Sequence, residues 1–159
     1  QVGVLTNIDP TRLPDDGYVH SPERLCDLMR TQVDVVLPEG AAVLNAADPL
    51  VAEMARLSDG EVIFFAADPA CPLAIAHRAA GGRTVTLDAG QIVLGRGQDE
   101  IAVCDPGAWP RAGTGLRQAD DVLAAVAAAW ALGLTPDQIR DGIDTSPKNV
   151  KPKTENPQI

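Results

Sequence analysis

The sequence predicts an α/β protein: a partial doubly wound parallel sheet with a small antiparallel β meander and a C-terminal helix pair. Three observations lead to this prediction. Short apolar runs at residues 2–5, 41–44 and 62–65 suit strands that are buried on both faces. Amphipathic stretches separate these runs, and the order β-α-β-α-β is typical of parallel strands joined by crossovers. Short alternating segments and two helical stretches follow.

Composition narrows the class of protein further. A chain of 159 residues is long enough for one full core, and with 3% aromatic residues that core must consist of Ala, Val, Leu and Ile. The net charge of -9 opposes binding to nucleic acid or to an anionic membrane. No apolar run approaches the roughly 20 residues that span a bilayer, and no signal peptide precedes the first strand, so we expect a soluble, cytoplasmic protein.

The first two helices are predicted from their starts. Ser21 and Pro22 supply an N-cap and a first-turn proline, and the apolar side of that helix is expected to consist of Leu25, Leu28, Met29, Val33 and Val36. Asp48 and Pro49 repeat the pattern directly after the second strand. The apolar side of this second helix is expected to consist of Leu50, Met54 and Leu57.

The second half of the chain changes in character at Pro69. Alternating segments at 84–87, 91–94 and 100–103, separated by glycine-containing turns, predict a meander over residues 82–104. A loop over residues 105–115 precedes an alanine-rich helix from residue 118 to 132. Thr135 and Gln138 form a capping box that starts a shorter helix, which completes a helix pair at 118–143. The polar, proline-rich residues 146–159 are expected to be a flexible tail or linker.

The familiar short motifs are absent. The chain contains neither the P-loop pattern nor the dinucleotide-binding glycine fingerprint, and Gly95-Arg96-Gly97 suits a hairpin turn better than a phosphate cradle. His20 and His77 are isolated, and the three cysteines have no C-x-x-C spacing, so neither a zinc site nor a disulfide framework is indicated. The pairs Asp15-Asp16 and Asp120-Asp121 are interpreted as solvated or helix-dipole carboxylates.

Polar residues directly follow two of the predicted strands. Thr6 and Asn7 come after the first strand, and Asn45 and Asp48 come after the second. Open α/β sheets bind ligands outside the carboxyl ends of their strands. These four residues are therefore candidates for a binding site.

Several ordered segments carry a resemblance to a known family. Leu5-Thr6-Asn7-Ile8, the helix from Ser21 and the run 40–51 resemble the second half of the central domain of Mur ligases, most of all the cyanophycin-synthetase-like members. The likeness continues through Met54-Ala55, 64–66, the meander, 122–125 and 132–134, and so covers residues 1–145. The resemblance implies an enzyme that joins an amino acid or peptide to a carboxylate through an acyl phosphate, with ATP and Mg²⁺ as cofactors.

The resemblance also implies roles for individual residues. The implied cofactor-binding residues are Thr6, Asn7, Asn45, Asp48, Gln118 and Asp121, the last two near the adenine. Arg12 stands where the family has a metal-binding histidine, and a cation does not ligate a metal. Met29 stands where many members have a lysine. Neither a catalytic residue nor a metal ligand is therefore assigned.

Three hypotheses about function follow. In the first, the chain is a segment of an ATP-dependent amide-bond-forming ligase, inactive in isolation, with the P-loop half expected upstream of Gln1 and an amino-acid-binding lobe downstream of Thr145. The alternative is a non-catalytic pseudo-ligase that serves as a scaffold or dimerisation domain. A third hypothesis is a small nucleotide-binding module that is similar to the family only in fold.

Overall fold

The computed structural model describes residues 1–11, 13, 19–103 and 116–145, with side chains from residue 119 onward in the last range. Arg12, the whole of the predicted loop at 105–115 and the predicted tail at 146–159 lie outside the described residues. The elements of the described part follow the predicted order closely, with one helix in addition.

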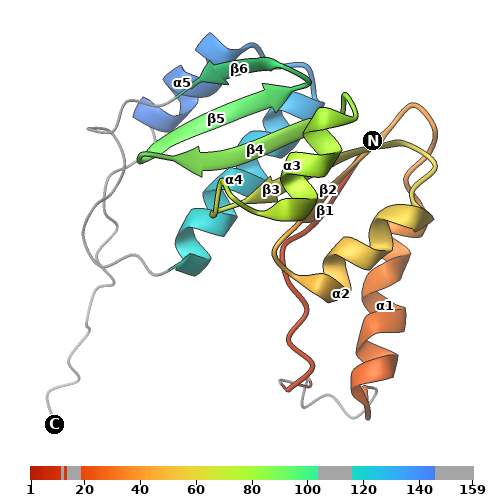
Figure 1. The fold of residues 1–159 in the computed structure, drawn as a ribbon. Helices are drawn as coiled ribbons and strands as arrows, with labels where there is room; N and C mark the ends of the chain where they lie inside the picture. Colours follow the sequence, from red (N-terminus) through yellow and green to blue (C-terminus); the bar gives the residue numbers. More distant parts are fainter. Residues whose placement is uncertain (12, 14–18, 104–115, 146–159) are drawn as a thin grey trace, which may run out of the picture.

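A six-stranded mixed sheet forms the centre of the fold (Figure 1). Its strands lie side by side in chain order: β1 (Val2–Leu5), β2 (Ala41–Asn45), β3 (Glu61–Ala66), β4 (Arg83–Asp88), β5 (Gln91–Arg96) and β6 (Asp99–Ala102). The strands β1 to β4 are parallel, whereas β5 is antiparallel to both of its neighbours. This arrangement confirms the predicted α/β class. The predicted meander is not a separate strip, because β4 pairs in parallel with β3 and continues the same sheet.

Helices cover both faces of the sheet (Figure 1). One face carries α1 (Pro22–Asp34), α2 (Pro49–Ala52) with its 3-10 continuation η1 (Glu53–Leu57), and α3 (Pro72–Ala79). The other face carries α4 (Leu116–Ala131) and α5 (Pro136–Thr145). The predicted caps are present: the Ser21 hydroxyl accepts from the Arg24 amide at 3.2 Å, and the Thr135 and Gln138 side chains bond each other's backbone amides. None of the described helices is long and apolar enough to cross a membrane.

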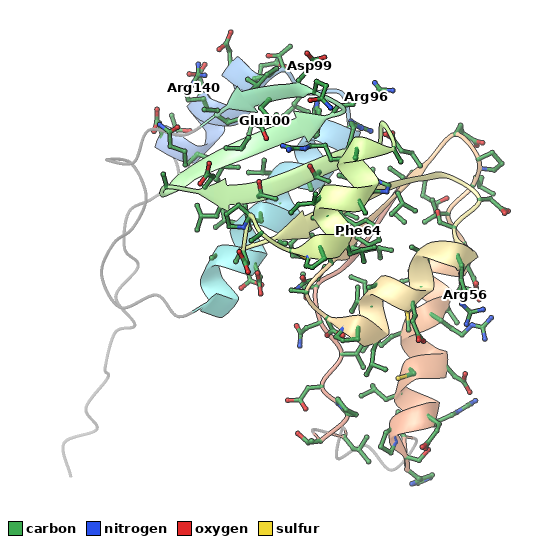
Figure 2. All side chains as sticks on the ribbon, in the orientation of Figure 1. Arg56, Phe64, Arg96, Asp99, Glu100 and Arg140 are labelled. Carbon is green, nitrogen blue, oxygen red and sulfur yellow. The ribbon has the colours of Figure 1, made fainter. Side chains whose placement is uncertain are left out.

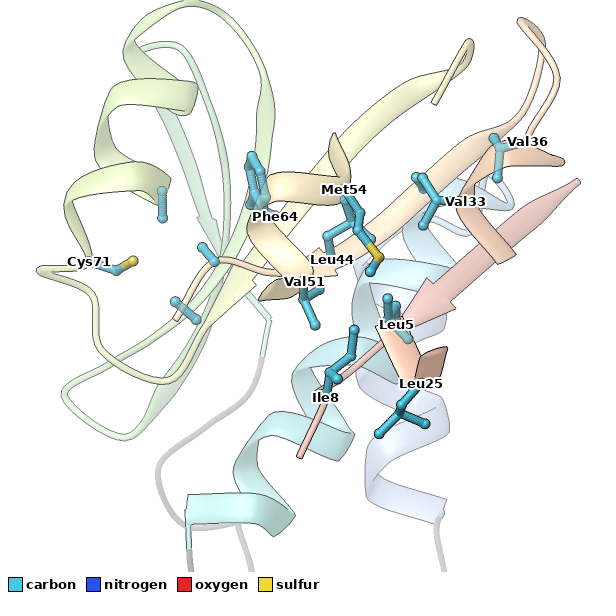
Figure 3. Close-up of a cluster of buried hydrophobic side chains, with 14 of the residues drawn as sticks. Leu5, Ile8, Leu25, Val33, Val36, Leu44, Val51, Met54, Phe64 and Cys71 are labelled. Carbon is cyan, nitrogen blue, oxygen red and sulfur yellow. The ribbon is translucent and has the colours of Figure 1, made fainter. Parts of the chain in front are cut away.

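Each face of the sheet has its own apolar core. All five residues of β2 are buried, as expected for a parallel strand covered on both sides. Leu44 and Phe64 belong to the core under α1 and α2, which Figure 3 shows with Leu5, Val51 and Met54 around them. Phe65 belongs to the core under α4. The ends of β1 and β2 are therefore packed between an apolar core on each face of the sheet.

The structure corrects three details of the sequence prediction. Leu28 does not join the apolar side of α1, because its side chain is 53% exposed, and Val36 is buried but follows the end of that helix. The helix after Asp48 is a single α-turn that continues as η1. The helix α3 was not predicted from the sequence at all. It has eight residues, of which Ala74 alone is buried. A helix that buries one residue needs no repeated apolar positions, and such a repeat is the signal by which a helix is predicted from sequence.

Candidate functional site

A concavity of about 510 Å³ lies where β1 and β2 end, beside the first half of α4. We call it the strand-end concavity. It is lined by Asn7, Ile8, Asn45, Ala47, Asp48, Pro49, Leu50 and Asp120. Three of these residues, Asn7, Asn45 and Asp48, were predicted as binding residues from their positions after the strands. The structure therefore brings them together at one end of the sheet.

Asp48 connects the two loops that form the concavity. One carboxylate oxygen, Oδ1, accepts hydrogen bonds from the backbone amides of Leu50 at 2.9 Å and Val51 at 3.2 Å, which makes Asp48 the N-cap of α2. The other, Oδ2, accepts from the Ile8 amide at 2.8 Å. A single side chain thus holds the loop after β1 against the start of α2.

Asn45 fixes the shape of the loop after β2. The residue is only 4% exposed, and its Oδ1 accepts a hydrogen bond from the Ala47 amide at 2.9 Å. The start of this loop is also bound to β3, because the Ala46 amide donates to the Phe65 carbonyl at 2.9 Å. A buried side-chain amide in this position is oriented before any ligand binds.

Of the two polar residues that follow β1, Asn7 lines the concavity and Thr6 does not. The Thr6 hydroxyl donates to Asn7 Oδ1 at 3.2 Å, and Thr6 does not line the concavity itself. Asn7 is exposed and forms part of the rim. Thr6 is therefore placed to orient Asn7, and Asn7 to meet a ligand.

The aspartate pair in α4 is divided between two environments. Asp120 lines the concavity, whereas Asp121 is exposed and is not among its lining residues. Gln118 belongs to the first turn of α4, and its side chain lies outside the described part. The sequence analysis missed Asp120, because an adjacent acidic pair near a helix start is ordinarily a solvated helix-dipole partner. Asp120 lines the concavity because of the way α4 is rotated about its axis, and this rotation is determined by the packing of α4 against the sheet.

Burial raises the pKa of the Asp120 carboxyl, and the negative charge of Asp121 raises the pKa further, while a hydrogen bond with Asn45 acts in the opposite direction. The raised pKa means that the folded protein binds this proton more tightly than the unfolded chain does. Stability should therefore fall as the pH rises from the ordinary aspartate pKa, about 3.9, through the raised value in the folded state.

The variant Asp120→Asn should remove this pH dependence. We expect it to be more stable than the parent at neutral pH and equal to it below about pH 4, where both side chains are uncharged. Asp121→Asn is the matched neighbour, and it should only reduce the dependence, since it removes one of the two causes of the shift. Urea denaturation at a series of pH values measures the stability of both variants. If the stability of Asp120→Asn depended on pH as that of the parent does, the raised pKa would not belong to Asp120.

The lining of the concavity limits the chemistry that it can support. Asn45, Asp48 and Asp120 offer oxygen acceptors, Ile8 and Leu50 offer apolar contact, and none of the lining residues is a cation. Within the described residues, no group of three or more His, Cys, Asp or Glu could hold a metal ion. Met29, which the resemblance places at the position of the family's lysine, packs against the apolar core under α1. The described residues therefore suit a neutral, hydrogen-bonding ligand group better than a free phosphate or a bare metal ion.

The chain is similar in sequence to known proteins. It is 31% identical over 146 residues to a cyanophycin synthetase of Synechocystis sp. and 30% identical over 146 residues to that of Crocosphaera subtropica, which is 91% of this chain and 17% of each relative. The chain is similar to one segment of these cyanophycin synthetases. No family model matches it. It spans only about a sixth of the length of these relatives, so their activity is not thereby established for this chain.

Solved structures agree with the Mur-ligase-like fold. A pseudomurein peptide ligase type C from Methanothermus fervidus matches with a TM-score of 0.58 and 20% identity, over 93% of this chain and 34% of that one. MurF from Acinetobacter baumannii matches with a TM-score of 0.59 and 20% identity, over 94% of this chain and 30% of that one. The similarity to these ligases, which is low in sequence, shows the fold alone.

Proposed function

We propose that this Mur-ligase-like segment is part of an ATP-dependent ligase that forms an amide bond between an amino acid or peptide and a carboxylate. In this proposal the strand-end concavity is the segment's contribution to the nucleotide site. The observation that carries it is the convergence of Asn7, Asn45 and Asp48 on one concavity at the carboxyl ends of parallel strands. The homology to cyanophycin synthetases supports the same reaction class.

The chemistry of the concavity favours the adenosine half of ATP over its phosphates. Carboxylate and amide oxygens accept hydrogen bonds from an adenine amino group or from ribose hydroxyls, and Ile8 and Leu50 offer apolar surface to a ring. Asp48 and Asp120 would repel a bare triphosphate. Binding of the phosphates and of Mg²⁺ would therefore depend on groups beyond these lining residues.

A segment that supplies one end of a nucleotide site, without a phosphate loop in its sequence, should bind ATP but neither hydrolyse it nor form amide bonds by itself. The pseudo-ligase scaffold remains the second candidate function. It is favoured by Met29, which makes apolar core contacts at the position of the family's lysine.

Calorimetric titration of Mg²⁺-ATP into the 159-residue chain tests the proposal. We expect saturable binding in the micromolar range without ATP hydrolysis. Asn45→Asp keeps the acceptor for the Ala47 amide and adds a third negative charge, so it should weaken binding at least about tenfold, or ~1.4 kcal/mol. Absence of binding to the parent chain would overturn the nucleotide site and leave the scaffold.

The aspartate pair supplies a matched comparison in the same titration. The structure places Asp120 at the concavity, whereas the resemblance implies contact with adenine through Asp121. A loss of affinity in Asp120→Asn alone would agree with the concavity as the binding surface. A loss in Asp121→Asn alone would instead place the nucleotide on the exposed side of α4.

A further inference from the structure

The strand-end concavity contains two polar side chains that come from different elements and contact each other. Asn45 is the last residue of β2, and Asp120 lies in the first half of α4. Both line the concavity, and their side chains share a hydrogen bond. The pair therefore joins the sheet to the helix at the site that we propose for the nucleotide.

Asn45 presents a hydrogen-bond donor to the concavity. Its side-chain carbonyl oxygen, Oδ1, accepts from the Ala47 amide at 2.9 Å, so the amino group, Nδ2, is the end of the side chain that remains for other contacts. This group carries two N–H donors. One donor serves the bond with Asp120, and the second is available to a bound molecule. Because Asn45 is buried, packing holds the amide in this orientation.

Asp120 presents an acceptor beside that donor. An ionised carboxylate has two oxygens and only accepts hydrogen bonds. One oxygen is sufficient for Asn45, so the other is available to a ligand. The second carboxylate of the lining, Asp48, already accepts from three backbone amides, and the lining contains no cation that would compete for Asp120. The concavity thus offers one donor and one acceptor next to each other.

A donor next to an acceptor is complementary to the edge of a 6-aminopurine. Adenine carries an amino donor at position 6 beside a ring-nitrogen acceptor, whereas a 6-oxopurine carries a carbonyl acceptor at position 6. The Asp120 carboxylate would accept from the amino group, and Asn45 would donate to the ring nitrogen. A 6-oxopurine would instead place a carbonyl oxygen against the Asp120 carboxylate, and neither of these two acceptors has a proton to share.

We propose that Asp120, positioned by Asn45, determines the base specificity of the strand-end concavity. Its carboxylate selects a purine with a 6-amino group against one with a 6-oxo group. This inference rests on the proposed nucleotide site and goes beyond it, because apolar contact with Ile8 and Leu50 would hold either purine equally well.

Calorimetric titration with two nucleotides at neutral pH tests the proposal. Mg²⁺-ATP and Mg²⁺-ITP carry the same triphosphate, so a difference in their affinities reports on the base alone. The parent chain should bind Mg²⁺-ATP at least about tenfold more tightly than Mg²⁺-ITP. In Asp120→Asn this ratio should fall below about threefold, because an amide can donate to a 6-oxo group as well as accept from a 6-amino group.

Two further aspartate variants separate this effect from a general loss of negative charge. Asp99→Asn removes the same charge from β6, which forms the opposite edge of the sheet from β1 (Figure 2), and it should keep the tenfold ratio. Asp121→Asn removes the charge directly beside Asp120, and it should keep the ratio as well, because Asp121 is exposed and does not line the concavity.

Three results would overturn the inference and leave the nucleotide site in place. They are equal affinities of the parent chain for the two nucleotides, a ratio that Asp120→Asn does not change, and a ratio that falls in Asp121→Asn alone. If the parent chain bound neither nucleotide, the proposed function would fail, and the inference would fail with it.

Discussion

Replacing Phe65 with alanine is expected to destabilise the chain by about 3–5 kcal/mol. Phe65 is fully buried in β3, the strand between β2 and β4, and belongs to the core under α4. Few aromatic side chains are available to fill this interior, and the surrounding alanine and valine side chains cannot move far enough to close the space that the ring leaves. The loss should therefore include both the transfer free energy of the ring and a cavity penalty.

Urea denaturation followed by circular dichroism measures this loss. Leu132→Ala is a suitable control, because Leu132 follows α4 and is 67% exposed, so its removal should change stability by less than about 0.5 kcal/mol. Equal effects of Phe65→Ala and Leu132→Ala would mean that the core under α4 is not packed as the structure describes.

Replacing Asp48 with alanine is expected to cost about 2–4 kcal/mol and to weaken binding of ATP at the same time. Three backbone amides, those of Ile8, Leu50 and Val51, lose the carboxylate that accepts their hydrogen bonds. The loss of an N-cap alone costs about 0.5–2 kcal/mol, and a hydrogen bond to a charged group contributes about 1.5–3 kcal/mol. Release of Ile8 would also free the loop that carries Asn7, one wall of the strand-end concavity.

Two substitutions of Asp48, to asparagine and to alanine, separate its role as the N-cap of α2 from its hydrogen bond to the Ile8 amide. Asp48→Asn keeps one oxygen for the α2 cap and loses the second acceptor, so it should cost about half as much as Asp48→Ala. Asp68→Ala is the matched control, because Asp68 accepts a single hydrogen bond, from the Ala70 amide at 2.9 Å, in an exposed turn. Its loss should be about 1 kcal/mol or less. If Asp48→Ala were no worse than Asp68→Ala, Asp48 would not connect the two loops.

Much of the fold could be predicted from local signals in the sequence. Apolar runs marked β1, β2 and β3, and the Ser21 and Asp48 caps marked the starts of α1 and α2. The pairing of β4 with β3 could not be predicted, because the alternation in β4 resembles that of a hairpin strand, and pairing partners are a tertiary property. Helix α3 was missed for the related reason that only one of its residues is buried.

The candidate site shows the same division. Asn7, Asn45 and Asp48 could be predicted, because any residue directly after a parallel strand falls at the same edge of the sheet. The choice between Asp120 and Asp121 depends on the rotation of α4 about its axis, which packing against the sheet determines.

If the strand-end concavity holds part of a nucleotide, an NMR titration of the ¹⁵N-labelled chain with Mg²⁺-ATP should locate it there. We expect saturable shifts of the backbone amides of Asn7, Asn45, Ala47 and Asp120, with the amides of Thr84, Thr86 and Val93, which do not line the concavity, unchanged. Shifts confined to other parts of the sheet, or none at concentrations that saturate the calorimetric signal, would show that the nucleotide does not bind at the concavity.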